Sequence, residues 1–145
     1  MLGTQCIVGF CDGNSWADHV HPPWHQLFGH SILIYHPSGR RWVQWRLWRG
    51  DESVEVVLSG RYFTDDSEIA RRWALAVHGI IRKSAIEVVT DIHAGRLVPV
   101  LPQWQSDAVP ISLVCQHPSQ VSERVRLLQR FLQQRCQGWM ADYLV

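Results

Sequence analysis

The chain has 145 residues, of which 46% are hydrophobic and 19% charged, so it can form one globular domain with a core of its own. Its fourteen basic and thirteen acidic residues give a formal net charge of +1 and do not cluster, which argues against a nucleic-acid-binding surface. Residues 1–4 carry no basic leader and no apolar run is long enough to cross a bilayer, so we expect a cytoplasmic protein without a membrane partner.

The four cysteines are Cys6, Cys11, Cys115 and Cys136, and they contain no C-x-x-C pair. A disulfide framework would need an oxidising compartment, which nothing in the sequence indicates. We therefore expect reduced thiols, with at least the last two in the core.

The first 24 residues have the weakest pattern in the chain. Glycines interrupt them and only residues 5–10 have the composition of a short strand, so we expect a poorly ordered segment. Four histidines have a spacing that could place imidazoles around zinc: His19, His21, His25 and His30. Pro22 and Pro23 stiffen this series and no cysteine or carboxylate joins it, so we interpret these histidines as exposed loop residues and predict no metal site and no cofactor.

Three strands are expected next. Residues 30–35 form an apolar run that ends at the turn signal of residues 37–39. Residues 41–48 alternate as in a half-buried strand, whose inner face holds Val43, Trp45 and Leu47. Residues 50–51 turn the chain, and the third strand follows with Val54, Val56 and Leu58.

The segment 59–80 predicts a strand end, a short polar turn and a complete helix. Asp65 and Glu68 have the spacing of a capping box, which places the helix start near Asp66, and Gly79 is expected to end the helix in the left-handed conformation. An apolar stripe at helical spacing is expected to face the core: Ile69, Trp73, Ala76, Val77 and Ile80. A strand that leads into a helix N-terminus is a natural place for a small anionic ligand.

A second helix is expected after a short apolar step at residues 80–81. Ser84 and Glu87 again have capping-box spacing, and Gly95 is expected to end the helix. Its inner face is predicted to contain Ile86, Val89, Ile92 and His93.

The last third of the sequence predicts two strands and a helix. Residues 97–101 are expected to form a strand in which Pro99 requires an edge position or a crossover, and residues 109–115 form another. The helix covers residues 121–136 with the stripe Val121, Val125, Leu128 and Leu132. Its spread arginines are typical of a solvated face rather than of a nucleic-acid-binding helix.

Several of these segments resemble one protein family in the same order. Residues 97–104, Leu-Val-Pro-Val-Leu-Pro-Gln-Trp, with residues 91–96 before them and 109–118 after them, resemble the C-terminal part of the effector-binding domain of LysR-type transcriptional regulators. Residues 121–132 are similar to the last helix of that domain, and residues 59–79 are similar to its strand, turn and central helix.

The resemblance covers roughly residues 21–136 and has three departures. The family has Gly-x-Gly at the end of the central helix, where this chain has Val77, His78 and Gly79. Residues 1–24 have no counterpart. The winged helix-turn-helix of the family, and the first strand and helix units of its effector domain, are also missing from this sequence.

The resemblance implies an α/β fold like that of periplasmic binding proteins, in which two lobes hold the effector between them. The domain would occupy residues 25–145, with a nearly complete second lobe at about residues 30–80 and a partial first lobe at about residues 97–136. A partial first lobe leaves three apolar surfaces without their usual cover: residues 97–101, residues 111–115 and the stripe of the last helix. We therefore expect self-association or disorder.

The function implied by the resemblance is small-molecule sensing in transcription regulation. The effector of the family is commonly an organic acid or an aromatic metabolite, and it biases the protein between two conformations. The ligand-binding positions that carry over lie at the turn before the central helix: Tyr62, Phe63, Thr64, Asp65, Asp66 and Ser67. The hydroxyl group of Thr64 and the amides of Asp66 and Ser67 could hold an anion, although both aspartates would oppose it. Without the winged domain, we expect no direct specific DNA binding by this chain.

Two other functions remain open. An interaction module without an effector, or a truncated remnant, could keep the association surfaces and pair with full-length regulators. A small enzyme would need a catalytic pattern, but no G-x-S-x-G, H-E-x-x-H, Walker or G-x-G-x-x-G motif occurs, and solvent exposure explains Asp91 and His93 as well as catalysis does. We therefore predict that the chain is not an enzyme and has no catalytic residue.

Overall fold

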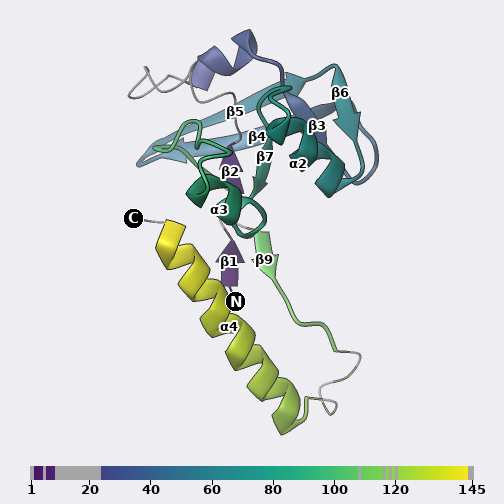
Figure 1. Cartoon of the computed structure of the whole chain (residues 1–145), viewed down its shortest axis with the longest axis vertical. Coiled ribbons are helices and arrows are strands. Elements are labelled where there is room, and N and C mark those ends of the chain that lie inside the picture. The colour runs from purple at the N-terminus through teal and green to yellow at the C-terminus, as the bar shows by residue number, and fades with distance from the viewer. Residues whose placement is uncertain are drawn as a thin grey trace.

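The computed structural model describes residues 2–4, 6–8, 24–107, 109–115, 117, 119 and 121–143. As the sequence predicts, strands and helices combine in an α/β fold. Figure 1 shows most strands and two short helices gathered at one end, with the long C-terminal helix extending away from them. A short 3-10 helix, η1 (Trp24–Gly29), precedes the strand predicted at residues 30–35.

The longest pairing is the antiparallel hairpin of β4 (Trp42–Arg49) and β5 (Glu52–Ser59). Gly50 opens its turn at φ 57°, and β8 (Gln105–Ser106) pairs with the other edge of β4. The predicted alternation is confirmed, because the inner face is buried or half-buried along both strands: Val43, Trp45, Leu47, Val54, Val56 and Leu58.

A second sheet is parallel. β3 (Leu33–Tyr35) pairs in parallel with β6 (Tyr62–Thr64), and Ile32 forms a parallel bridge with Ile80. The chain passes from β6 to Ile80 through α2 (Ser67–Leu75), so β3 lies at the centre of a strand–helix–strand unit. The sequence analysis does not predict β6, because three residues are too few for a periodic pattern.

Two glycines permit the close approach of the chain to the start of this central strand. A Cβ atom on Gly60 would lie 2.0 Å from the carbonyl oxygen of Ile32, and one on Gly79 would lie 2.2 Å from that of Ser31. Any side chain at either position would displace the backbone, so both glycines are needed for the parallel pairing.

The end of α2 differs from the prediction. The left-handed residue is Val77, at φ 63°, rather than Gly79. The amide of His78 donates to the carbonyl of Trp73 and the amide of Val77 to that of Ala74, both at 3.0 Å, which completes a Schellman motif. A β-branched residue is strained in this conformation, so Val77 stores unfavourable energy at the helix end.

The apolar stripe predicted for α2 is wrong in part. Ile69 is 42% exposed and Val77 is 51% exposed, whereas Ala70 and Ala74 are the buried residues of the helix. Both alanines pack in one cluster with Leu33 of β3, since small side chains let a helix lie close to a strand.

β7 (Arg82–Ser84) leads into α3 (Ala85–His93), which begins after Ser84 and ends at Gly95, as predicted. The expected capping box does not form, because the side chain of Ser84 makes no cap hydrogen bond and Glu87 is bonded elsewhere. The buried face is turned from the predicted one, so that His93 is exposed and the helix buries Ala85, Val88, Val89 and Asp91.

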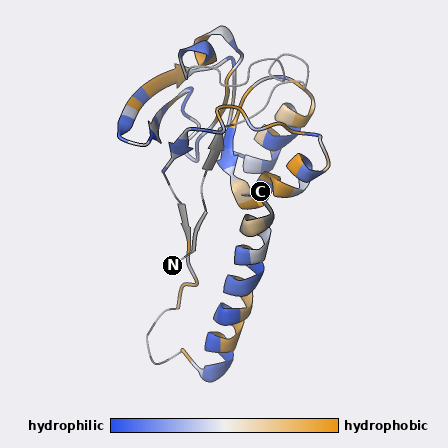
Figure 2. Cartoon of the chain, turned by 90° about the vertical axis from the view of Figure 1, so that its left-hand side faces the viewer, coloured by the Kyte–Doolittle hydropathy of each residue, from blue (hydrophilic) through white to orange (hydrophobic). Residues whose placement is uncertain are grey.

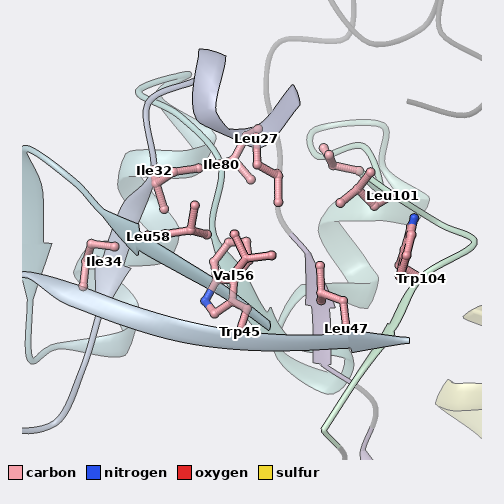
Figure 3. Close-up of a cluster of buried hydrophobic side chains, with 11 residues drawn as sticks. Leu27, Ile32, Ile34, Trp45, Leu47, Val56, Leu58, Ile80, Leu101 and Trp104 are labelled. Atoms are coloured by element: carbon pink, nitrogen blue, oxygen red, sulfur yellow. The ribbon is translucent and has the colours of Figure 1, made fainter. Parts of the chain in front are cut away.

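Residues 97–101 do not form the predicted strand. Pro99 lacks a backbone donor, and Leu101 takes φ 57°, which is incompatible with an extended strand. Leu97, Val100 and Leu101 are buried, so the expectation that this segment lacks cover is wrong. The last two join the larger of two buried clusters, which Figure 3 shows against one face of the long strands: Leu27, Ile32, Ile34, Trp45, Leu47, Val56, Leu58, Ile80, Val100, Leu101 and Trp104.

Two short strands near the start of the chain reach distant elements. β1 (Leu2–Thr4) pairs with β9 (Val109–Ile111), and β2 (Cys6–Val8) pairs with β7. β2 confirms the short strand predicted within residues 5–10, and β9 is shorter than the predicted strand. Cys136 is buried as expected, whereas Cys115 is exposed.

The last helix, α4 (Glu123–Tyr143), continues beyond its predicted end, and one end of it contacts α3 and β1 while the other lies away from them (Figure 1). Figure 2 shows hydrophobic residues along this helix among hydrophilic ones. Five large apolar side chains of α4 are between 41% and 56% exposed: Leu127, Leu128, Phe131, Leu132 and Trp139. Residues 111–115 are exposed as expected, whereas the stripe predicted for this helix is uncovered only in part, because Leu128 and Leu132 are exposed and Val121 and Val125 are half-buried.

Substitutions at the left-handed residues that end α2 and α3 should change stability in opposite directions. Val77→Gly should raise the free energy of unfolding by about 1 kcal/mol, because a left-handed β-branched residue costs more than the extra freedom of glycine in the unfolded chain. Gly95→Ala is the matched control, since α3 ends in the same conformation, and it should lower stability by about 1 kcal/mol. Urea unfolding measures both, and a less stable Val77→Gly protein would contradict the strain at Val77.

Candidate functional site

The carboxyl ends of the two parallel strands meet at one edge of the sheet. Tyr35 ends β3 opposite Thr64, which ends β6, and the amide of His36 donates to the carbonyl of Thr64 at 3.1 Å. α2 begins three residues after β6. This is the edge at which open parallel sheets hold ligands, because loops and helix N-termini converge there.

The first turn of α2 is capped by Asp66 and not by Asp65 as predicted. Oδ1 of Asp66 accepts from the amides of Glu68 (2.8 Å) and Ile69 (3.0 Å), and the amide of Asp66 donates to Oγ1 of Thr64 at 3.0 Å. Asp65 is exposed. Three amides of this turn are therefore occupied by groups of the chain itself, and the Asp66 carboxylate is committed to the cap.

Ser67 takes part in a partly buried polar network next to this turn. Lys83, with a side chain 2% exposed, donates to the carbonyl oxygen of Ser67 (3.1 Å), to its hydroxyl group, and to Glu87 (2.7 Å). The hydroxyl group of Ser67 in turn donates to Glu87 at 2.8 Å. The ammonium group also lies 5.5 Å from the ring centroid of Tyr35, so positive charge is held at the end of β3.

The two aromatic residues of the predicted site lie apart from the turn. Tyr62 stacks on His78 and contacts Trp73, with ring centroids 5.4 and 5.6 Å apart, so it packs against the end of α2. Phe63 is half-buried against the larger core cluster, with the guanidinium of Arg41 4.4 Å from its ring centroid. The structure thus brings Thr64, Asp66 and Ser67 together at the edge and directs both rings into packing.

Two cavities adjoin the same edge, and the sequence analysis did not anticipate them. The inner one has a volume of about 60 Å³ and is lined by Leu33, Tyr35, Val43, Trp45 and Arg82. The outer one, of about 400 Å³, is lined by Tyr35, His36, Pro37, Arg40, Trp42, Val43, Gln44 and Arg82. Arg82 directly follows the predicted apolar step at residues 80–81 and is the first residue of β7, so that step was the available signal for extended chain beside it.

Asp91 of α3 anchors α2 through a buried ion pair. Its side chain is 0% exposed, which contradicts the interpretation of this residue as solvent-exposed. One carboxylate oxygen accepts from Arg71 of α2 at 2.8 and 2.6 Å, and the other from Arg96 at 2.9 and 2.6 Å. Four charge-assisted contacts thus compensate for burying the charge and join α2, α3 and the loop after α3.

The charges on α2 shift two pKa values. The hydrogen bond from Arg72, with a further contribution from Arg71, lowers the pKa of Glu68. Burial acts to lower the pKa of Arg71, but its hydrogen bonds and charge attraction to Asp91 and Glu68 outweigh burial and raise it. Both groups are therefore charged at neutral pH, as the ion pairs require.

The described residues contain no group of three or more metal-ligating side chains. His19 and His21 of the possible zinc series lie outside them, so the structure does not test that series. Burial lowers the pKa of His30, which favours the neutral ring. No helix in the described part of the chain is long and apolar enough to cross a membrane.

Breaking the contact of Asp91 predicts a loss of stability. Asp91→Asn keeps the volume but removes the charge that pairs with Arg71 and Arg96, and it should lower the free energy of unfolding by about 2 kcal/mol, since Arg96 is exposed enough to turn to solvent. Arg72→Gln breaks only the exposed pair with Glu68, which solvent screens, and should change stability much less. Equal effects of the two substitutions in urea unfolding would contradict the role given to Asp91.

The comparisons with known proteins agree with one another. The model of the LysR substrate binding domain family matches residues 2–137. The HTH-type transcriptional activator TtdR of Escherichia coli K12 is 34% identical over 112 residues, which are 77% of this chain and 36% of TtdR. The chain therefore spans little more than a third of that relative.

Solved structures show the same fold. The regulatory domain of AphB from Vibrio vulnificus is 23% identical with a TM-score of 0.69, covering 92% of this chain and 66% of that one. The LysR-type regulator CrgA from Neisseria meningitidis is 23% identical with a TM-score of 0.63, covering 93% of this chain and 46% of CrgA. These regulatory domains have the α/β fold of periplasmic binding proteins. The chain belongs to the family of LysR substrate binding domains, the effector-binding domains of transcriptional regulators, and not to an enzyme family.

Proposed function

We propose that the effector of this chain is a small organic acid or aromatic metabolite that binds at the carboxyl edge of β3 and β6. The observation that carries the proposal is the convergence of the half-buried Thr64, the first turn of α2 and the buried ammonium of Lys83 at one edge. Of the predicted ligand-binding positions, Tyr62 to Ser67, those from Thr64 onward form the turn at this edge, whereas the rings of Tyr62 and Phe63 pack elsewhere. Because Asp66 is committed to the cap, only Asp65 opposes an anionic effector with a free carboxylate.

Within this site, the hydroxyl group of Thr64 is the group best placed to contact an effector. Its oxygen accepts from the amide of Asp66, which leaves its hydrogen to donate to a ligand. The amide of Ser67 follows the cap and lies at the positive end of α2.

Thr64→Ala should therefore weaken the binding of an effector acid by about tenfold, while Thr64→Ser keeps the hydroxyl group and most of the affinity. Backbone amide shifts during titration with a panel of small carboxylates measure both. If no acid shifts the amides of residues 62–67, or if the alanine and serine variants bind equally well, the assignment of the turn is wrong.

We also propose that the chain self-associates or pairs with related regulators through α4. Regulators of this family are oligomeric, and α4 exposes an apolar face that association would cover. The proposed setting is the cytoplasm, and DNA binding would belong to a partner, because basic residues are not clustered in this chain.

A negative charge placed on the exposed apolar face of α4 should weaken self-association. Phe131, 56% exposed, lies one turn from Leu128, and Phe131→Glu should raise the dissociation constant of the self-associated form by at least about tenfold. Gln137→Glu adds the same charge on the opposite side of the helix and should leave it unchanged. Sedimentation velocity measures both, and a parent chain that stays monomeric at high concentration would remove the basis for association.

A further inference from the structure

Both cavities at the carboxyl edge are lined by a guanidinium group that has one buried nitrogen without a partner. Nη1 of Arg82 is buried and has no hydrogen-bond partner among the residues that the structure describes. A buried guanidinium nitrogen without an acceptor is costly, so native proteins usually supply one. Arg82 lines both cavities, which leaves space for an acceptor beside it.

The charged side chains that line the two cavities are all positive. Arg40 lines the outer cavity with Arg82, and no acidic side chain is among the described residues lining either cavity. The amide of Ser38 donates to Nδ1 of His36 at 3.1 Å, so a neutral His36 ring carries its proton on Nε2 and can donate as well. The chemistry of the lining therefore favours an anionic ligand.

Apart from Gln44, which lines the outer cavity, the remaining walls are apolar and partly aromatic. Tyr35 and Val43 line both cavities, Trp45 lines the inner one and Trp42 the outer one. The inner volume of about 60 Å³ is enough for a carboxylate group, and the outer volume of about 400 Å³ is enough for a ring. A bare inorganic anion would fill only part of this space and leave the aromatic walls unused.

We propose that Arg82 binds the carboxylate of a compact, apolar organic acid, with its guanidinium as the charged partner and Tyr35, Val43 and Trp42 around the apolar body. This inference rests on the proposed effector function and names residues outside the turn at Tyr62 to Ser67. Guanidinium and carboxylate pair in a planar geometry with two parallel hydrogen bonds, which lysine cannot reproduce. Arg82 is thus the residue that would select acids over neutral analogues.

The test uses the full chain labelled with ¹⁵N and follows the indole resonances of Trp42 and Trp45. Sodium benzoate is the probe, benzamide is its neutral isostere and inorganic phosphate is the bare anion. Benzoate should shift both indoles and bind at least about tenfold more tightly than benzamide or phosphate. Arg82→Gln should remove this preference, Arg82→Lys should keep part of it, and the exposed Arg46→Gln, which lines neither cavity, should leave it unchanged.

Two results would reject the role of Arg82, and a third would reject the organic acid. One is an equal response of the indoles to benzoate and benzamide, or to benzoate in the parent chain and in Arg82→Gln, with amide spectra showing that the variant is folded. The other is a shift by benzoate of the amides of residues 64–67 alone, which would retain the proposed effector function and reject Arg82. Phosphate binding as tight as that of benzoate would reduce the site to a general anion site and also reject the organic acid.

Discussion

The buried carboxylate of Asp91 is the contact on which the position of α2 depends. A fully buried carboxylate is tolerated only when its oxygens accept enough hydrogen bonds. Arg71 and Arg96, which lie on two different elements, donate these hydrogen bonds to Asp91. Arg71 lies one turn after the start of α2, so the ion pair fixes the end of the helix that faces the carboxyl edge. Lys83 of β7 fixes the same end of α2 by its hydrogen bonds to Ser67 and Glu87.

The electrostatics of the edge follow from this arrangement. Amides of the helix N-terminus are largely used by the Asp66 cap, so the helix offers less to an anion than its position suggests. Cationic side chains supply the positive charge instead. Lys83 lies against Tyr35, and Arg40 and Arg82 line the cavities that share this tyrosine. An effector at this edge would therefore be held by side chains of β3, β4 and β7 as well as by the turn.

Periodic elements could be predicted from the sequence, and elements set by tertiary contacts could not. The hairpin of β4 and β5 shows its alternation in eight residues per strand, and Gly95 marks the end of α3. β6 has three residues and depends on its pairing with β3. The prediction that Gly79 ends α2 in the left-handed conformation was wrong, because Gly79 packs against Ser31 and the left-handed residue is Val77. Asp91 and Arg82 were missed because burial of a charge is a property of the fold, not of a local pattern.

The most direct measurement is amide hydrogen exchange with and without a saturating small acid. If the acid binds at the carboxyl edge, the amides of residues 67–70 at the start of α2 and of residues 82–84 in β7 should exchange more slowly, because the ligand stabilises the closed form of the elements it contacts. The amides of β9 and α4 should change less. Protection confined to β9 and α4, with none at α2 or β7, would contradict an effector site at this edge.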